Sequence, residues 1–312
     1  MQMKAVRIHE YGDTDILRYE DVDSPEPTAD EVRVQVRAAS VNPIDWKTRQ
    51  GAGIPVEFPW TVGWDVAGVV DEIGANVSDL EVGDEAYGLV HFSDGGGAYA
   101  EAITAPAAEL MTKPDRLSFE EAAGVPMVSL TAWQALEATD VGEGTRVLVH
   151  AAAGGVGHFA VQFAKQRNAH VIGTASGSNE EYLRELGVDE FVNYREQRFE
   201  EVIEPVDAMI DGIGGETFDR SLEILNGDGV IDKLPSDLTP EQQEKADEHG
   251  VQAVHTNVRW NREWFNEITA LIEEGAVTPT VETVLPLSET QRAHELSEDG
   301  HVRGKLVLTP DE

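Results

Sequence analysis

A glycine-rich turn carries the clearest chemistry in this sequence. Residues 145–174 read TRVLVHAAAGGVGHFAVQFAKQRNAHVIGT, in which an apolar run, a turn of small residues, a helical pattern and a second apolar run follow one another. This order predicts a dinucleotide-binding strand–turn–helix–strand unit, whose helix N-terminus offers free N–H groups to a pyrophosphate. We expect Gly154 to let the backbone approach the pyrophosphate and Gly157 to let the helix pack closely on the strand. Ala152 replaces the first glycine of the usual motif, so a tight turn in another α/β protein is the alternative.

The segment after the second apolar run bears on the choice of nucleotide. Enzymes that use NAD place an acidic residue at the end of this strand to accept the ribose hydroxyls, and an acid there repels the phosphate of NADP. Residues 174–178 read TASGS, and no acid occurs before Glu180 although the chain contains 59 Asp and Glu residues. We therefore predict NADPH as the cofactor, with Ser176 and Ser178 as contacts of its 2′-phosphate.

The composition limits the classes of function. A chain of 312 residues without cysteine suggests two domains and excludes disulfides, thiolate metal ligands and a thiol nucleophile. The net charge is −36, and the acids are spread along the whole chain. We interpret this as a halophilic protein, because molar salt screens charges beyond about 3 Å; an ordinary acidic enzyme is the alternative. Nucleic acid and anionic membranes are not expected partners of such a surface.

Location and metal binding can also be addressed. No apolar run approaches the roughly 18 residues of a membrane helix, and the N-terminus alternates like a strand, so we expect a cytoplasmic protein without a signal peptide. The nine histidines show no metal-ligand spacing. His150 and His158 flank the glycine turn, where we expect packing or surface roles.

The patterning divides the chain into a β-rich part and an α/β part. Short strands separated by turns characterise residues 1–120, whereas strands alternate with helices over 121–257, the pattern of a parallel sheet. Residues 258–312 are expected to return to the first domain as a helix near 264–274 and strand-like segments thereafter. Strands of the parallel sheet are predicted near 145–151, 170–175, 190–194, 206–211, 229–233 and 251–255.

Several landmarks along the whole chain carry a family resemblance. They are ASVNPIDWK at 39–47, FPWTVGWDVAG at 58–68, GAYAE at 97–101, HAAAGGVG at 150–157, DGIGG at 211–215 and GKLVL at 304–308. With them the chain resembles the zinc-independent medium-chain dehydrogenase/reductases, in the quinone oxidoreductase and enone reductase branch. The resemblance implies an α/β fold with a GroES-like β-rich catalytic domain and a Rossmann NADP-binding domain of doubly wound parallel sheet, with cofactor and substrate in the cleft between them.

The resemblance also implies the reaction. Zinc-dependent relatives bind their metal with a cysteine and a histidine–glutamate pair, and this chain has Asn42 and Trp64-Asp65 at those positions. Because tryptophan cannot ligate zinc, we expect no metal. Hydride transfer to a quinone or an α,β-unsaturated carbonyl needs no strong Lewis acid, only orientation and stabilisation of a developing oxyanion.

The loop after residue 41 supplies the candidate catalytic residues. In the family this loop faces the nicotinamide, so Asn42 is expected to donate a hydrogen bond to the substrate carbonyl, and Lys47 to stabilise an enolate or deliver a proton. Trp46 and Trp64 are candidate walls of the substrate pocket. The alternatives are a turn residue for Asn42, a solvated charge for Lys47 and domain core for the tryptophans. Lysine at 47, where quinone reductases often carry tyrosine, favours the enone branch.

The nucleotide contacts implied by the resemblance lie at the ends of the predicted parallel strands. Tyr194 matches a family tyrosine near the 2′-phosphate. Some relatives place a lysine near the position of Asn179 or Glu180, and Arg195 is the candidate substitute. The full predicted set of cofactor-binding residues is Ala153, Gly154, Gly155, Val156, Thr174, Ser176, Ser178, Tyr194, Gly212, Ile213 and Asn257.

Two other functions stay open. A 2-enoyl-thioester reductase on the same scaffold would need a basic entry for a carrier phosphate, which this acidic chain offers little of. An NADPH-binding sensor or structural protein would bind the nucleotide without turnover. The family also suggests a homodimer that pairs edge strands, for which 251–255 is the candidate.

Overall fold

The computed structural model describes residues 2–311, and these form two compact units. Unit 1 contains the described residues up to Met127, together with Trp260–Glu273 and the residues from Pro279 onward. Unit 2 contains Val128–Arg259 and Glu274–Thr278. Helix α3 (Pro126–Ala138) begins with the last two residues of the first segment and continues in unit 2.

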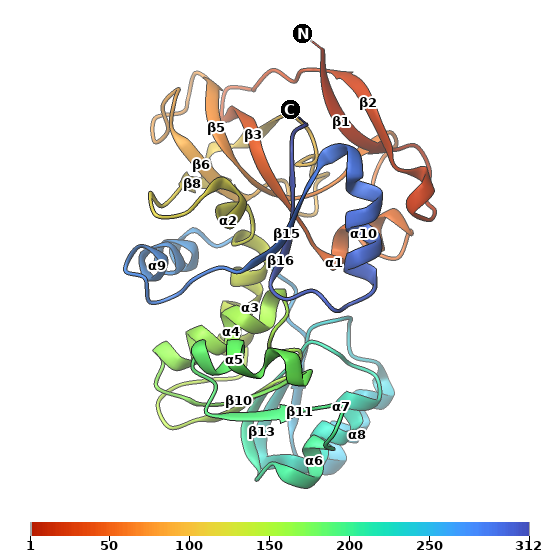
Figure 1. Ribbon diagram of the computed structural model, residues 1–312, viewed down its shortest axis with the longest axis vertical. Coiled ribbons are helices and arrows are strands. Elements are labelled where there is room, and N and C mark those ends of the chain that lie inside the picture. The colour runs from red at the N-terminus through yellow and green to blue at the C-terminus, as the bar shows by residue number, and fades with distance from the viewer. Residues whose placement is uncertain (1, 312) are drawn as a thin grey trace. The chain divides into compact units, whose positions relative to one another are not determined.

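Unit 1 is built on two β-sheets. The larger is seven-stranded, with the order β15-β16-β3-β5-β6-β8 and β7 paired to β3; the smaller has the order β2-β1-β4. Strand β3 alternates in burial because Val32, Val34 and Val36 face the core. Strands β3 and β5 pair antiparallel and are drawn side by side in Figure 1. The strands are β1 (Gln2–Ile8), β2 (Arg18–Asp23), β3 (Glu31–Val41), β4 (Trp60–Thr61), β5 (Asp65–Ile73), β6 (Glu85–Leu89), β7 (Ala102–Pro106), β8 (Leu110–Thr112), β15 (Val281–Pro286) and β16 (Lys305–Thr309).

The helices of unit 1 are α1 (Pro43–Arg49), α2 (Phe119–Ala123), α9 (Arg262–Glu273) and α10 (Thr290–Glu298). The prediction of only strand-like segments after the helix near 264–274 was wrong, because α10 lies between β15 and β16. Its buried residues Thr290, Ala293 and His294 follow the helical spacing of three and four. Helix α10 packs against α1.

Unit 2 contains a six-stranded sheet in which every pairing is parallel, with the order β11-β10-β9-β12-β13-β14. The chain proceeds from β9 to one side and then returns to the other, so the order switches between β9 and β12. The predicted doubly wound sheet is confirmed. The strands are β9 (Arg146–Val149), β10 (His170–Ala175), β11 (Glu190–Asn193), β12 (Val206–Asp211), β13 (Leu225–Lys233) and β14 (Gln252–Val254).

The helices of unit 2 are α4 (Gly155–Gln166), α5 (Glu180–Glu185), α6 (Phe199–Val202), α7 (Glu216–Ser221) and α8 (Pro240–His249). Thr239 caps α8 in a capping box with Gln242. Beyond α5, Gly187 has a φ of +102° and is the stop that the sequence predicted.

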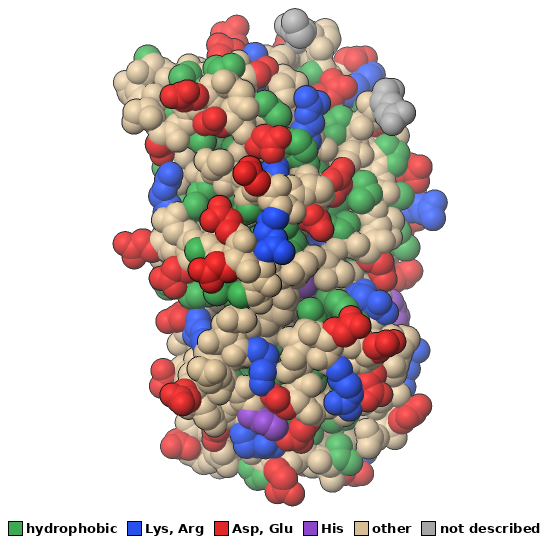
Figure 2. Space-filling model, turned by 60° about the vertical axis from the view of Figure 1, so that its left-hand side comes forward, with side chains coloured by type: hydrophobic (Ala, Val, Ile, Leu, Met, Phe, Trp, Pro, Cys, Tyr) green, Lys and Arg blue, Asp and Glu red, His purple; other side chains and the backbone are tan. Residues whose placement is uncertain are grey.

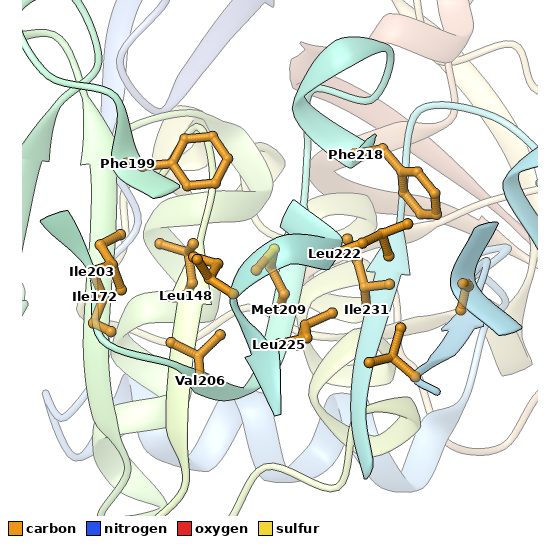
Figure 3. Close-up of a cluster of buried hydrophobic side chains, with 14 of the residues drawn as sticks. Leu148, Ile172, Phe199, Ile203, Val206, Met209, Phe218, Leu222, Leu225 and Ile231 are labelled. Atoms are coloured by element: carbon orange, nitrogen blue, oxygen red, sulfur yellow. The ribbon is translucent and has the colours of Figure 1, made fainter. Parts of the chain in front are cut away.

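One apolar cluster holds unit 2 together on one face of its sheet. Leu148, Met209 and Ile231 come from the adjacent strands β9, β12 and β13, and Phe199 and Phe218 pack over them (Figure 3). All five side chains are buried, so the cluster fixes the positions of the strand ends that follow.

The exposed surface carries the acidic excess. On the face shown in Figure 2, Asp and Glu side chains are scattered over the surface instead of gathering in one patch. Among residues 2–311, no helix is long and apolar enough to cross a lipid bilayer.

Candidate functional site

The glycine turn joins β9 to α4 at the carboxyl edge of the parallel sheet. A Cβ atom at Gly157 would lie 2.2 Å from the carbonyl oxygen of Ala151 and 2.7 Å from the Cα of Ala152, so only glycine allows this close packing of helix on turn. A Cβ at Gly154 would approach the same oxygen only to 3.3 Å and would meet no other atom within 4 Å. The two glycines therefore differ: Gly157 is required by the fold, and Gly154 leaves open space at the turn.

The N-terminus of α4 is free of a side-chain cap. Gly154 is its N-cap residue and Gly155 and Val156 form the first turn, where backbone N–H groups have no partner within a helix. The positive end of the helix dipole adds to these donors. This arrangement fits a pyrophosphate, and the residues that would hold it are Ala153, Gly154, Gly155 and Val156.

His150 links the end of β9 to β10. Its Nε2 lies 3.1 Å from Ser221 Oγ, and that hydroxyl donates its hydrogen to the carbonyl of Thr217. The Ser221 oxygen is therefore the acceptor from Nε2–H, which leaves Nδ1 as the acceptor from the Thr174 hydroxyl at 3.0 Å. Burial lowers the pKa of His150 to about 3, so the ring is neutral at pH 7. The predicted packing role of His150 thus has a specific form: it fixes Thr174.

Thr174 is itself a predicted cofactor contact. Its backbone carbonyl accepts a hydrogen bond from the N–H of Ala152, which ties β10 to the glycine turn. Because its hydroxyl hydrogen is donated to His150, the oxygen has lone pairs to offer only to a donor, such as a ribose hydroxyl. His158 is buried in α4, with Nδ1 3.0 Å from the carbonyl of Gly154.

The predicted phosphate contacts follow β10 directly. The hydroxyls of Ser176 and Ser178 lie 3.1 Å apart, and Asn179 donates to the former. Tyr194 comes at the end of the neighbouring strand β11, is 52% exposed, and has the Arg195 guanidinium 5.8 Å from its ring centre. These residues of unit 2 form one segment of the sheet edge.

An acidic helix face adjoins this segment. An open hollow is lined by Gly177, Ser178 and four residues at the start and end of α5: Glu180, Glu181, Arg184 and Glu185. Arg184 donates to Glu180 at 2.8 Å and compensates that one charge. Glu181 and Glu185 leave the hollow negative. Negative charge here opposes the 2′-phosphate of NADPH and can accept the ribose hydroxyls of NADH.

The loop after β12 presents an exposed apolar side chain. Asp211 accepts hydrogen bonds from the N–H groups of Ile213 and Gly214, both at 2.9 Å, and burial raises its pKa. This turn holds Gly212 and leaves Ile213 53% exposed. Asn257 is exposed and lies in the segment after β14. Both are predicted cofactor contacts, and both remain predictions.

A buried polar network in unit 1 surrounds Asn42. Its side-chain Nδ2 donates to Asp65 at 2.8 Å, and its Oδ1 accepts from Lys305 Nζ at 2.6 Å. All three side chains are at most 2% exposed. In this structure both ends of the amide have protein partners. The predicted donation from Asn42 to a substrate carbonyl stays a prediction.

Asn42 also starts α1. Its side chain and Asp45 form a capping box, with Asp45 Oδ2 accepting the Asn42 N–H at 2.7 Å. Tyr99 donates its hydroxyl to the same carboxylate oxygen at 2.6 Å. Burial raises the pKa of Asp45 to about 7 in spite of these hydrogen bonds.

Lys47 and Trp46 lie on α1 and are partly buried. The Lys47 ammonium is 5.6 Å from the centre of the Trp46 ring, and burial lowers the pKa of Lys47. Trp46 donates its indole N–H to Ser297 of α10 at 3.2 Å. A half-buried lysine with a lowered pKa is suited to proton donation, which an ordinary solvated lysine is not.

Trp64 occupies the core of unit 1. It is fully buried, and its ring centre lies 5.4 Å from that of Trp60 and 5.8 Å from that of Phe92. These contacts agree with the alternative of domain core, and the role of Trp64 as a wall of the substrate pocket stays a prediction.

Metal ligation is disfavoured by the chemistry of this network. The family resemblance puts Asn42 and Trp64 where zinc-dependent relatives carry ligands, and in this structure the Lys305 ammonium already bonds the Asn42 oxygen. A resident cation at that oxygen repels a second one, so the donor set does not fit zinc. Among residues 2–311, no group of three or more His, Asp or Glu side chains is arranged to hold a metal ion.

Comparison with known proteins places this architecture. Residues 28–115 match the alcohol dehydrogenase GroES-like domain, and residues 186–308 match a domain described as zinc-binding dehydrogenase. The chain is 32% identical to the chloroplast envelope quinone oxidoreductase homolog of Arabidopsis thaliana, over 99% of this chain and 98% of the relative. The chain belongs to the medium-chain dehydrogenase/reductase family.

Two further members of the family narrow the comparison. The NADPH-dependent alkenal/one oxidoreductase of Arabidopsis thaliana is 33% identical over 99% of this chain and 80% of its own length. The quinone oxidoreductase structure from Coxiella burnetii has a TM-score of 0.95 and 37% identity, with all of both chains covered. These homologues support NAD(P)H oxidoreductase activity on a small molecule for this medium-chain dehydrogenase/reductase.

Sequence reasoning missed several residues of the network. Lys305 was recognised only as part of a closing strand, and Asp65 only as the neighbour of Trp64. One signal in the sequence could have pointed to Lys305: it is a lysine at the start of an apolar strand, in a chain where basic residues are scarce.

Proposed function

We propose that this protein is a metal-free, NADPH-dependent reductase of quinones or α,β-unsaturated carbonyl compounds. The observation that carries the metal-free part is the 2.6 Å hydrogen bond from Lys305 to Asn42, which puts an ammonium where a ligand set would need a metal. The uncapped N-terminus of α4 and the serine segment after β10 support the nucleotide part.

NADPH, when bound, supplies the hydride for the reduction. The residues of this chain then serve the acceptor. Hydride addition to the β-carbon of an enone leaves an enolate, which takes one proton at the α-carbon; a quinone takes hydride and one proton to give the hydroquinone. Lys47 is proposed to stabilise the developing oxyanion and to provide that proton, a role to which its lowered pKa is suited.

The first experiment measures NADPH oxidation in concentrated KCl with a quinone and a short-chain enone as parallel acceptors, and NADH as the alternative donor. We expect turnover with at least one acceptor and a preference for NADPH. Lys47→Met should lower kcat for the enone about 100-fold or more, since a general acid contributes a factor of about 10² to 10⁴. The control Lys4→Met removes an exposed lysine that pairs with Asp21, and it should leave kcat unchanged.

Tight NADPH binding without turnover of either acceptor would contradict the reductase and favour a sensing role. Equal activity of wild type and Lys47→Met would remove Lys47 from the mechanism and leave the reductase intact.

The proposal includes a cytoplasmic homodimer. Strand β14 is at the edge of the sheet of unit 2, where an unpaired strand can extend the sheet into a second copy. Light scattering at several protein concentrations distinguishes a dimer from a monomer.

A further inference from the structure

A buried ammonium in unit 1 has no part in the steps proposed above. Lys305 is 2% exposed at the start of β16, and its Nζ donates to the backbone carbonyl of Val41 at 2.9 Å and to Asn42 Oδ1 at 2.6 Å. Both acceptors are neutral oxygens. Burial lowers the pKa of Lys305, while the charges of Asp65 and Asp45 oppose that shift. Burying an ammonium against neutral acceptors costs free energy of folding. We therefore ask which role in the reaction Lys305 could have.

The ammonium determines which way the Asn42 amide faces. An ammonium can only donate, so the amide oxygen must face Lys305; a carboxylate can only accept, so the amide nitrogen must face Asp65. Rotating the amide by half a turn would oppose two donors on one side and two acceptors on the other. The side chain therefore has one orientation.

Asp65 is fixed in its turn by three donors, of which the Asn42 amide is one. The Ser40 hydroxyl donates to its Oδ2 at 2.7 Å, and the N–H of Met127, in the first turn of α3, donates to its Oδ1 at 2.9 Å. A carboxylate in this place also stabilises the N-terminus of a helix. Lys305, Asn42 and Asp65 thus join β16, the start of α1, β5 and the start of α3.

The same asparagine starts the helix that carries Lys47. Two hydrogen bonds join Asn42 to Asp45. The backbone N–H of Asn42 donates to the Asp45 carboxylate at 2.7 Å, and the backbone N–H of Asp45 donates to the backbone carbonyl of Asn42 at 3.0 Å. Both bonds use the backbone of Asn42, and Lys305 also holds the backbone just before it, through the Val41 carbonyl at 2.9 Å. Loss of Lys305 therefore frees the chain that leads into α1 and, with this short helix, moves Lys47.

We propose that Lys305 is a positioning residue of the reductase reaction, which holds the Asn42 amide and the start of α1 in the orientation that Lys47 needs. This inference rests on the proposed function. It requires that the effect of Lys305 on turnover pass through Asn42, which distinguishes positioning from general stability.

The test is a double-mutant cycle of Lys305→Met and Asn42→Ala, with kcat, KM and the NADPH dissociation constant measured for each variant. A displacement of about 1 Å in a catalytic group costs up to about 100-fold. We expect Lys305→Met to lower kcat about 10- to 100-fold with NADPH binding unchanged, and the double variant to be no slower than the slower single variant.

Lys113→Met is the matched control. Lys113 is also a buried lysine of unit 1, 5% exposed; its Nζ donates to the carbonyls of Pro114 and Leu117 and, unlike Lys305, also pairs with a carboxylate, that of Glu85 at 3.0 Å. It should lose thermal stability without a comparable loss of kcat. Lys305→Gln, which keeps a donor and removes the charge, replaces the methionine variant if that variant does not fold, and it should retain more activity.

Three results are decisive. Equal losses of kcat in Lys305→Met and Lys113→Met, or multiplicative losses in the cycle, would overturn the positioning role while leaving the reductase standing. An inactive wild type would overturn the proposed function and this inference with it. A non-additive cycle with the control unaffected supports both.

Discussion

The Nδ1 atom of His150 lies 3.0 Å from the hydroxyl oxygen of Thr174 and accepts its hydrogen, joining the ends of the neighbouring strands β9 and β10. The other ring nitrogen donates to Ser221 at 3.1 Å. A neutral imidazole with both nitrogens hydrogen-bonded thus fixes Thr174, at the end of β10, relative to the start of the glycine turn.

Replacing His150 with phenylalanine keeps a ring against Phe199, whose centre is 4.6 Å away, and removes both hydrogen bonds. Leaving the hydroxyls of Thr174 and Ser221 without this partner should cost about 1–3 kcal/mol of stability. We expect the NADPH dissociation constant, measured by fluorescence titration, to rise about tenfold because Thr174 loses its fixed position. His170→Phe is the control at the opposite end of β10. Equal weakening of NADPH binding in both variants would show that the hydrogen bond from Thr174 to His150 does not position the cofactor contact.

The two glycines of the turn should respond differently to alanine. Gly157→Ala places a Cβ 2.2 Å from the Ala151 carbonyl oxygen, so the helix must move and unit 2 should lose several kcal/mol of stability. Gly154→Ala meets only one atom, at 3.3 Å, and should fold normally, yet its methyl group occupies the space left for a pyrophosphate. Thermal unfolding and NADPH titration separate the two effects. A stable Gly154→Ala with unchanged affinity would place the nucleotide elsewhere.

Nucleotide preference should change when an acid is placed after β10. Ser176→Asp puts a carboxylate beside Ser178, where it repels a 2′-phosphate and can accept ribose hydroxyls. The ratio of kcat/KM for NADPH to that for NADH should fall at least about tenfold, the effect of about 1.4 kcal/mol of repulsion. Ser78→Asp makes the same change at an exposed serine of unit 1 as a control. A wild type that already prefers NADH would instead point to the acids of α5 as ribose ligands.

The parallel-sheet unit, unit 2, was largely predictable from sequence because its signals are local. The run at 147–149, the turn and the helix after it are adjacent in the chain, and strands β10 and β12 begin and end where the apolar patterns do. Gly157 was predicted for close packing, and the 2.2 Å contact of a Cβ there gives the physical reason.

The polar network of unit 1 was not predictable because its partners are far apart in the chain. Lys305 and Asn42 are separated by 263 positions, and no spacing rule connects them. Helix α1 was also unexpected: its Asn42–Asp45 capping box lies in a segment interpreted as a catalytic loop, and Pro43 at its first position supports the helix start. The role of Trp64 was not predictable for the same reason. A tryptophan in a pocket wall and one in a domain core differ only in what packs against the ring, and the sequence does not show those contacts.

His294 should make the protein sensitive to acid. It lies on α10, is fully buried and packs against the Tyr99 ring, and among the described residues neither ring nitrogen has a hydrogen-bond partner. Burial, aided by the charge of Arg49, lowers its pKa from 6.5 to about 3. Between these two pH values the unfolded chain binds a proton that the folded chain does not, so the free energy of unfolding falls as the pH falls.

His294→Phe keeps the ring contact with Tyr99 and removes the titration. Below pH 6.5 its stability should exceed that of the wild type by an amount that grows about 1.4 kcal/mol per pH unit. Denaturant unfolding at several pH values in constant KCl measures this difference. His150 titrates in the same window and remains in the variant, so part of the acid sensitivity should persist. A difference independent of pH would show that His294 is not the proton acceptor.

The acidic surface should make folding depend on salt. With 59 acidic and 23 basic residues, the carboxylates repel one another. On the face shown in Figure 2 they are scattered. Raising KCl from about 0.1 M to about 1 M shortens the Debye length from about 10 Å to about 3 Å and removes most of this repulsion. We expect the Tm to rise steeply over that range and to level off above it, while sucrose, which is uncharged, should not reproduce the steep part. A Tm that does not change between these KCl concentrations would show that the repulsion is already balanced by ion pairs, and the halophilic interpretation would then fail.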